Sequence, residues 1–120
     1  MARILLADDD RGSLDFVCRA LEMDGHTVVA TQDGSEALEK LKSDGGFDVL
    51  VTDVHMPGLD GITLAQKAEG IAPAMRLVLM SGLADVLDQA RSLEARGARL
   101  LAKPFPIEKI RAEVRAALAT

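Results

Sequence analysis

The chain has 120 residues, 48% of them apolar, which suits one packed domain spanning residues 1–120 and argues against a disordered tail. Its formal net charge of −5 argues against nucleic acid as a partner, because binding to a phosphate backbone needs a basic patch. The lone Cys18 excludes an intrachain disulfide and fits a reducing cytoplasm, and the apolar runs are far too short to span a membrane. We therefore expect a cytoplasmic protein that binds neither nucleic acid nor membrane.

Five short apolar runs alternate with five helix-like stretches along the chain. The runs lie at 4–7, 28–30, 49–51, 77–80 and 100–102. Four of them are apolar without alternation, which is typical of strands buried on both faces of a parallel sheet. The pattern therefore predicts five parallel strands at these positions.

The first helix is predicted by an apolar stripe at the spacing i, i+3, i+4, i+7. Its members are Leu14, Val17, Cys18 and Leu21. Asp10 is expected to cap this helix, and Cys18 is expected to be a buried structural thiol. His26 follows Gly25 just before the second strand and is predicted to be a solvated turn residue.

The other helices also carry boundary signals. Asp33, with Glu36 three residues later, predicts a capping box at the start of the second helix, and Asp60 is expected to cap a short third helix. Apolar residues between 86 and 93 predict the fourth helix. Pro106 suits the first turn of the fifth. The inner face of this last helix is predicted to consist of Ile107, Ile110, Val114 and Leu118.

Strict alternation of strands and helices predicts an α/β fold. We expect a (βα)5 doubly wound, five-stranded parallel sheet with right-handed crossovers. Such a sheet commonly takes the flavodoxin-like strand order 2-1-3-4-5, in which the order reverses between the first and third strands. Ligands of open parallel sheets bind outside the carboxyl ends of the strands at that reversal.

Polar residues stand at these carboxyl ends. Asp8, Asp9 and Asp10 follow the first strand, Asp53 ends the third, Ser81 follows the fourth and Lys103 follows the fifth. Because the strand order reverses between the first and third strands, we expect Asp9 and Asp53 to face each other across the crevice. Ser81 and Lys103 are then expected on the far side.

Carboxylates gathered in one crevice repel each other. Two unit charges ~4 Å apart cost about 4 kcal/mol at an effective dielectric of about 20, a large share of the roughly 5–15 kcal/mol that stabilises a typical domain. Mg²⁺ relieves the repulsion, because it binds carboxylates, waters and phosphate oxygens. A metal ion beside a lysine also neutralises the charge that develops in phosphoryl transfer. The pattern therefore favours a Mg²⁺-dependent phosphoryl-transfer site.

Six features in chain order together resemble the receiver domains of two-component response regulators. They are Asp8-Asp9, Asp53, Met56-Pro57, Asp60-Gly61, Ser81 and Lys103-Pro104-Phe105. The resemblance covers the whole chain and implies a receiver without an output domain. It implies a phosphoryl group accepted from a sensor histidine kinase or a histidine phosphotransferase. It implies no enzyme activity beyond self-phosphorylation and slow autodephosphorylation.

The resemblance also implies how the metal and the phosphoryl group are held. Asp53 would be the phosphoacceptor. Asp9 and Asp53 would bind Mg²⁺ directly, together with the backbone carbonyl of His55. Asp8 would act through a metal-bound water or as an outer ligand.

Two further residues would bind the phosphoryl oxygens: Ser81 would donate a hydrogen bond and Lys103 would pair with them. The bond between Lys103 and Pro104 is expected to be cis. Receivers often have an aromatic residue three positions before this lysine, where the chain has Leu100, so the switch formed by Ser81 and Leu100 departs from the family pattern. Leu83 stands where polar side chains often assist hydrolysis, so the lifetime of the phosphoryl group stays open.

The predicted output is a phosphorylation-dependent contact with a downstream protein. The contact surface is expected on the fourth helix (86–93), the fifth strand (100–102) and the fifth helix (107–118). Resemblance to receivers associated with regulated proteolysis implies a place in that process and in the cell cycle.

Three alternatives remain beside the phosphoacceptor. A nucleotide or flavin binder shares the architecture, but three carboxylates would repel its phosphate, and the chain has no Walker or G-x-G-x-x-G pattern. A metal-dependent phosphohydrolase often has a second Asp two residues after its nucleophile, where this chain has His55. A receiver that is never phosphorylated is the third, and the intact acidic set with Ser81 and Lys103 speaks against it.

Overall fold

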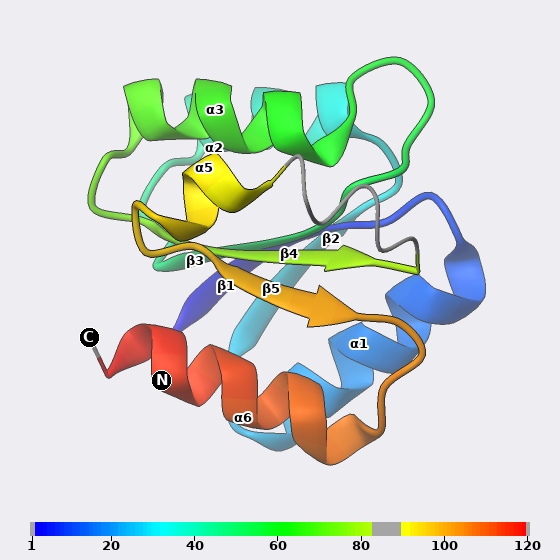
Figure 1. Ribbon diagram of the computed structural model, residues 1–120. Helices are drawn as coiled ribbons and strands as arrows, with labels where there is room; N and C mark the ends of the chain where they lie inside the picture. The colour runs from blue at the N-terminus through cyan, green and yellow to red at the C-terminus, as the bar shows by residue number, and fades with distance from the viewer. Residues whose placement is uncertain (1, 83–89, 120) are drawn as a thin grey trace.

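The computed structural model describes residues 2–82 and 90–119 and contains a five-stranded parallel sheet in the order β2-β1-β3-β4-β5 (Figure 1). The strands are β1 (Arg3–Ala7), β2 (Thr27–Thr31), β3 (Val49–Asp53), β4 (Arg76–Ser81) and β5 (Arg99–Ala102). Each predicted apolar run lies within one of them, and the predicted strand order is confirmed. Because β1 pairs with both β2 and β3, the strand order reverses between β1 and β3.

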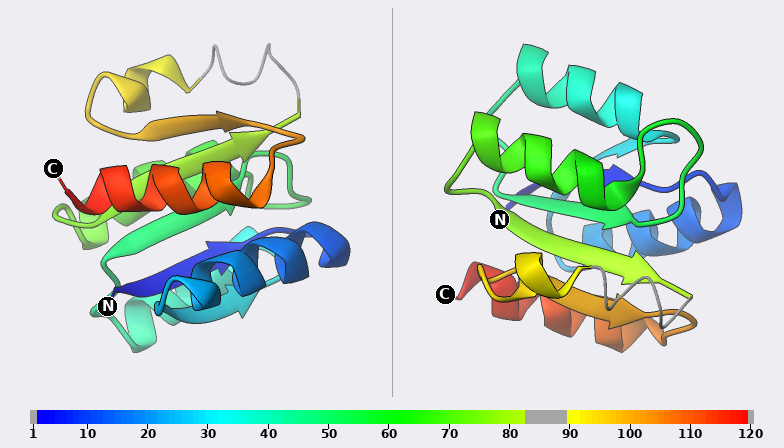
Figure 2. Two further views of the ribbon diagram at one scale, coloured as in Figure 1. Left: turned by 90° about the horizontal axis from the view of Figure 1, so that it is seen from below. Right: turned by 45° about the horizontal axis from the view of Figure 1, so that its top comes forward.

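Helices cover both faces of the sheet. The described helices are α1 (Arg11–Met23), α2 (Gly34–Ser43), α3 (Gly61–Ile71), α5 (Arg91–Glu94) and α6 (Ile107–Leu118). Figures 1 and 2 show α1 and α6 on one face, and α2, α3 and the short α5 on the other. This is the doubly wound arrangement that the alternation predicts. Within residues 2–82 and 90–119, no helix has the length and apolar character needed to cross a bilayer.

Burial on both faces explains why the strands are apolar without alternation. All five residues of β3 are buried. Leu50 belongs to the core under α2 and α3, whereas Val49 and Val51 belong to the core under α1 and α6. Successive side chains of a strand point to opposite faces. Asp53 therefore projects on the face of Val49 and Val51, towards the layer of α1 and α6.

An aspartate caps each of the first three helices, at the edge of the sheet where the strands end. The bonds run from the backbone N–H groups of Ser13 to Asp10 (3.1 Å), of Glu36 to Asp33 (2.7 Å) and of Thr63 to Asp60 (2.9 Å). These bonds satisfy N–H groups that the first turn of a helix leaves unpaired. The three predicted caps are confirmed. The Glu36 carboxylate accepts from the N–H of Gln32, one residue before the cap, and not from Asp33 as in a standard capping box.

Some predictions about single residues are wrong or only partly met. Pro106 is the N-cap of α6 and lies one residue before its first turn. Leu118 is 37% exposed, because Ala117, about 100° away around the helix, takes the buried position at this end of α6. Cys18 is only partly buried, at the border of the core under α1 and α6. Residues 86–89 of the predicted fourth helix lie outside the described residues.

His26 is not the solvated turn residue that the sequence predicts. Its Nδ1 accepts a hydrogen bond from the backbone N–H of Ala2 at 3.1 Å, and burial lowers its pKa. The neighbouring Asp24 accepts hydrogen bonds from Arg111 Nε at 2.8 Å and from Arg115 Nη2 at 2.6 Å. The turn after α1 is therefore packed against α6 and against the start of β1.

Candidate functional site

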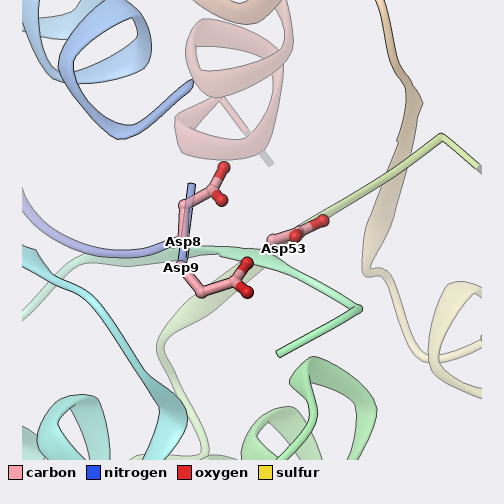
Figure 3. Close-up of side chains that lie close together, drawn as sticks. All are labelled: Asp8, Asp9 and Asp53. Atoms are coloured by element: carbon pink, nitrogen blue, oxygen red, sulfur yellow. The ribbon is translucent and has the colours of Figure 1, made fainter. Parts of the chain in front are cut away.

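Three aspartates gather where the strand order reverses. Asp8 and Asp9 follow β1 and Asp53 ends β3, and each contributes a carboxylate oxygen to a group in which all oxygens lie within 4.8 Å of one another (Figure 3). Asp8 is fully buried and Asp53 is 8% exposed, whereas Asp9 is exposed. The structure thus brings together the carboxylates that the sequence places at these two strand ends.

Lys103 is the nearest cation to this cluster among the described residues. Its Nζ donates to Asp8 Oδ2 at 2.8 Å and lies 3.6 Å from Asp53 Oδ1. Its backbone N–H donates to the carbonyl of Ser81 at 2.8 Å. The bond to Pro104 is cis, so that prediction is confirmed. The lysine expected on the far side of the crevice therefore bridges two of its carboxylates.

Both oxygens of the buried Asp8 have a donor. Oδ1 accepts from the backbone N–H of Asp10 at 3.0 Å, and Oδ2 accepts from Lys103. These bonds offset the free energy of burying a charged group, which is large when the group is unpaired. Hydrogen bonds therefore hold both oxygens of Asp8, whereas the carboxylate of Asp53 pairs with Lys103 at the longer distance of 3.6 Å.

Burial raises the pKa of Asp53 to about 6. The ammonium group of Lys103 opposes this rise, whereas the charges of Asp8 and Asp9 add to it. A carboxyl group whose pKa is shifted by burial and by specific charged neighbours is typical of functional sites. The fold thus raises the pKa of the carboxylate that the sequence singles out.

We expect Asp53→Asn to stabilise the metal-free protein at neutral pH. The raised pKa means that the folded parent binds this proton more tightly than the unfolded chain does, so the parent loses stability as the pH rises from about 4 to about 6. The difference of about two pKa units corresponds to at most about 3 kcal/mol. The gain should therefore be complete above about pH 7 and vanish below about pH 4. Urea unfolding with EDTA measures it across this range.

The exposed Asp15 supplies the matched control, because Asp15→Asn removes a carboxylate of the same kind from α1. Its stability relative to the parent should not follow the same pH profile. A gain for Asp53→Asn that is equal at pH 4 and pH 7 would contradict the electrostatic explanation.

The remaining predicted site residues surround the cluster. Ser81 ends β4, next to Met80, the residue that pairs with Asp53 in the β3–β4 ladder, and it is buried. Leu100 lies in β5, partly buried against the core under α2 and α3. His55 is exposed and lies in the loop that follows β3. The structure therefore places Ser81 in β4, beside β3, and Leu100 in β5, the strand beyond it.

A hollow beside the cluster was not foreseen from the sequence. It measures about 220 Å³ and is lined by Asp10, Ser13, Phe16, Lys103, Pro104 and Phe105. The rings of Phe16 and Phe105 lie 6.2 Å apart between centroids, and Phe16 is 41% exposed. The signal that could have found it is the position of Phe16, which lies off the apolar stripe of α1.

Comparison with known proteins identifies the family. The family model described as "Response regulator receiver domain" matches residues 4–115. The response regulator receiver protein CpdR of Brucella abortus is 38% identical over 114 residues, 95% of this chain and 94% of that protein. Response regulator MprA of Mycobacterium ulcerans is 36% identical over 97% of this chain, which spans only 50% of MprA. A solved response regulator receiver protein from Sinorhizobium medicae superposes with a TM-score of 0.90 at 32% identity, covering 99% of this chain and 95% of that one. The chain therefore belongs to the response regulator receiver domain family.

Proposed function

We propose that residues 1–120 form one receiver domain in which Asp53 accepts the phosphoryl group. Receiver domains as a family accept a phosphoryl group on an aspartate, and they regulate other proteins and are not enzymes in the usual sense. The observation that carries the assignment to Asp53 is its position, 3.6 Å from Lys103 Nζ and within the group of three carboxylates.

The hydrogen bonds favour Asp53 over its two neighbours as the nucleophile. Both oxygens of Asp8 already accept bonds, from Asp10 and from Lys103, and Asp8 has no exposed surface. Asp9 is exposed and makes no ion pair with Lys103 at the distances that join Lys103 to the other two. Asp53 combines limited access to solvent with a nearby cation, which is what a carboxylate oxygen needs to attack phosphorus.

The acidic cluster fits Mg²⁺. Its oxygens are hard ligands, and three of them within 4.8 Å can share one small divalent cation. We propose Asp9, Asp53 and the backbone carbonyl of His55 as direct ligands, with Asp8 acting through a water molecule. When bound, the ion supplies positive charge that offsets the carboxylates and the phosphoryl oxygens.

The protein's own groups then position the transfer. An oxygen of Asp53 forms a bond to phosphorus while the bond from phosphorus to the donor's leaving atom breaks, and the leaving group keeps that electron pair. The ammonium group of Lys103 pairs with a phosphoryl oxygen, and the hydroxyl of Ser81 donates to another. When water attacks the same phosphorus, the bond between phosphorus and the Asp53 oxygen breaks, the carboxylate is regenerated and inorganic phosphate leaves. This is the slow autodephosphorylation that we propose as the only hydrolytic activity.

Incubation with acetyl phosphate, with and without Mg²⁺, tests the proposed function. We expect a single phosphoryl adduct in the intact mass spectrum when Mg²⁺ is present and none after EDTA. Peptide mapping at acidic pH should place the adduct on Asp53. An adduct of equal yield without Mg²⁺, or one that maps to another residue, would refute the proposal.

Mg²⁺ is expected to raise the melting temperature, and Asp9→Asn is expected to have opposite effects with and without the metal. Without Mg²⁺ the variant should melt slightly above the parent, because one of three repelling charges is removed; the gain is below about 1 kcal/mol for so exposed a group. With Mg²⁺ the parent should gain more, because a ligand that binds only the folded state stabilises it by mass action. Melting curves over a Mg²⁺ titration measure both, and a variant that melts lower without metal speaks against repulsion.

We propose that the phosphodonor is a histidine kinase or a histidine phosphotransferase of the cytoplasm, and that the output is a protein contact. A donor can approach Asp53 beside the exposed Phe16 and the 220 Å³ hollow next to Lys103.

A second hollow could take part in the proposed contact with a downstream protein. It measures about 430 Å³, lies along β5 and α6, and is lined by Glu94, Gly97, Ala98, Arg99, Leu100, Glu113 and Ala117. We also propose a place in regulated proteolysis and the cell cycle, which the likeness to the receiver protein CpdR supports. A pull-down that compares the parent, beryllofluoride-treated parent and Asp53→Ala tests it, since one partner set in all three contradicts a phosphorylation-dependent contact.

Leu100 is proposed to transmit the change by repacking. It has no ring to swing, and it packs against the core that also holds Leu93 of α5 and Ala90, the N-cap of α5. We expect beryllofluoride to change amide chemical shifts at Ser81 and Leu100 as well as at Asp53, whereas amides of α2 should hardly move. Shift changes confined to Asp8, Asp9 and Asp53 would mean that this route is absent.

A further inference from the structure

A buried hydroxyl group holds the end of β3. Thr52 directly precedes Asp53 and is fully buried, and its Oγ1 donates to the backbone carbonyl of Asp53 at 2.8 Å. The last pair of the β1–β3 ladder joins Ala7 to Thr52, so Asp53 lies one position beyond that ladder. A buried backbone carbonyl needs a donor. Thr52 supplies one from within the chain, where β1 has already ended.

The same peptide unit is held at its other polar group. The N–H of Val54, which shares a rigid peptide plane with the carbonyl of Asp53, donates to the carbonyl of Met80 at 2.9 Å. Thr52 and Met80 therefore fix the orientation of this plane from two sides. The plane sets the direction in which the chain leaves Asp53 and thus the direction of the loop that carries His55.

Gly61, the first residue of α3, packs closely against the same peptide unit. Its N–H donates to the carbonyl of Val54 at 2.8 Å. A Cβ at this position would lie 2.1 Å from the carbonyl oxygen of Asp53 and 2.8 Å from the Cα of Val54. Gly61 is not among the glycines with positive φ, so close approach and not backbone conformation is what requires a glycine here.

We propose that Thr52 and Gly61 are positioning residues for the phosphoacceptor. Together they lock the peptide after Asp53, so that its carboxylate and the following loop meet the metal and the phosphoryl group in one geometry. The proposal rests on the proposed role of Asp53 and names two residues outside the acidic cluster that the reaction depends on. Small displacements at a reacting centre lower rates strongly, by roughly a hundredfold for about 1 Å.

Two substitutions at position 52 separate the hydroxyl group from the packing of the side chain. Thr52→Val keeps the shape and removes the donor, whereas Thr52→Ser keeps the donor and removes a methyl group. With acetyl phosphate and Mg²⁺, we expect Thr52→Val to lower the maximal phosphorylation rate by between about tenfold and a hundredfold, with little change in the donor concentration at half-maximal rate. Thr52→Ser should stay within about threefold of the parent. In the metal-free proteins, the Val54 amide should exchange hydrogen faster in Thr52→Val than in the parent, whereas Thr52→Ser should exchange at the rate of the parent.

The glycine has a matched control on the same helix. Gly61→Ala should slow phosphorylation at least as much as Thr52→Val, because the added Cβ must displace the carbonyl of Asp53. Gly70→Ala, where a Cβ would meet nothing within 4 Å, should leave the rate unchanged. If Thr52→Val does not fold, the comparison of Gly61→Ala with Gly70→Ala tests the positioning role by itself. Equal phosphorylation rates for these two variants overturn the proposal.

Equal losses in Thr52→Val and Thr52→Ser would also overturn it, since packing alone would then explain the effect. A Thr52→Val protein that matches the parent in both rate and Val54 exchange would overturn it as well. A parent that takes up no phosphoryl group overturns the proposed function instead. Exchange at Val54 in the metal-free variants still shows in that case whether the hydroxyl group holds the peptide.

Discussion

Replacing Asp53 with alanine should abolish uptake of the phosphoryl group completely. Asp53 is slightly exposed, its pKa is raised to about 6, and its carboxylate lies 3.6 Å from Lys103 Nζ. Asp8 cannot replace it, because both of its oxygens are engaged and it is fully buried. Asp9 is exposed, so an acyl phosphate formed there would lack the surroundings that stabilise the transferred group.

The measurement is intact mass after acetyl phosphate and Mg²⁺, with Asp15→Ala as a control that removes an exposed carboxylate of α1. The control should react like the parent. Thermal unfolding of both variants must also be measured, because only a folded Asp53→Ala protein that stays unmodified supports Asp53 as the phosphoacceptor. A full adduct on folded Asp53→Ala would move the phosphoacceptor to another residue.

Replacing Lys103 with methionine should impair both the reaction and the fold. The variant keeps the apolar stem of the side chain and loses its charge. The phosphoryl oxygens then lose their pairing cation, and removal of one such group from a reaction centre typically lowers the rate by about 10²–10³-fold. Buried Asp8 also loses its 2.8 Å donor, which costs about 1–3 kcal/mol in the metal-free protein.

Mg²⁺ should restore part of the lost stability of Lys103→Met but not the lost rate, because the ion can offset Asp8 and Asp53 without taking the place of the ammonium group. Lys109→Met is the matched control. Lys109 is 54% exposed and pairs with Glu113 one turn along α6 at 3.3 Å, so its loss should change stability by less than about 0.5 kcal/mol. If Lys103→Met is as stable in EDTA as Lys109→Met, the hydrogen bond from Lys103 to Asp8 does not contribute to the stability of the fold.

The sequence predicts the strands and the helix caps well for local reasons. A run such as 49–51, buried on both faces, must be apolar throughout, and this distinguishes it from the amphipathic helices around it. Asp10, Asp33 and Asp60 are recognisable as caps because the bond that they accept comes from a residue only three positions away. Alternation predicts a doubly wound parallel sheet, whose common strand order brings Asp8, Asp9 and Asp53 to the same end of the sheet.

The sequence does not predict contacts between segments that lie far apart along the chain. Nothing near His26 indicates that the backbone N–H of Ala2 will donate to its ring, since Gly25 marks only a turn. Lys103 can be assigned to a strand end, but the preference for Asp8 over Asp53 depends on how β1 and β5 stand across the crevice. Thr52 gives no signal beyond that of a β-branched residue in a strand. Its bond to the carbonyl of Asp53 depends on where β1 ends.

The aspartate caps also govern how the site responds to ionic strength. Asp10, Asp33 and Asp60 start helices at the edge of the sheet that carries Asp8, Asp9 and Asp53, so the caps add their charge to that of the cluster. The caps also neutralise helix ends that would otherwise be partly positive. We therefore expect a small anionic phosphodonor to approach against a negative field that salt screens over about 10 Å at 0.1 M, so that its encounter with Asp53 becomes faster as salt is added. Mg²⁺ is attracted by the same field, and its binding weakens as that field is screened.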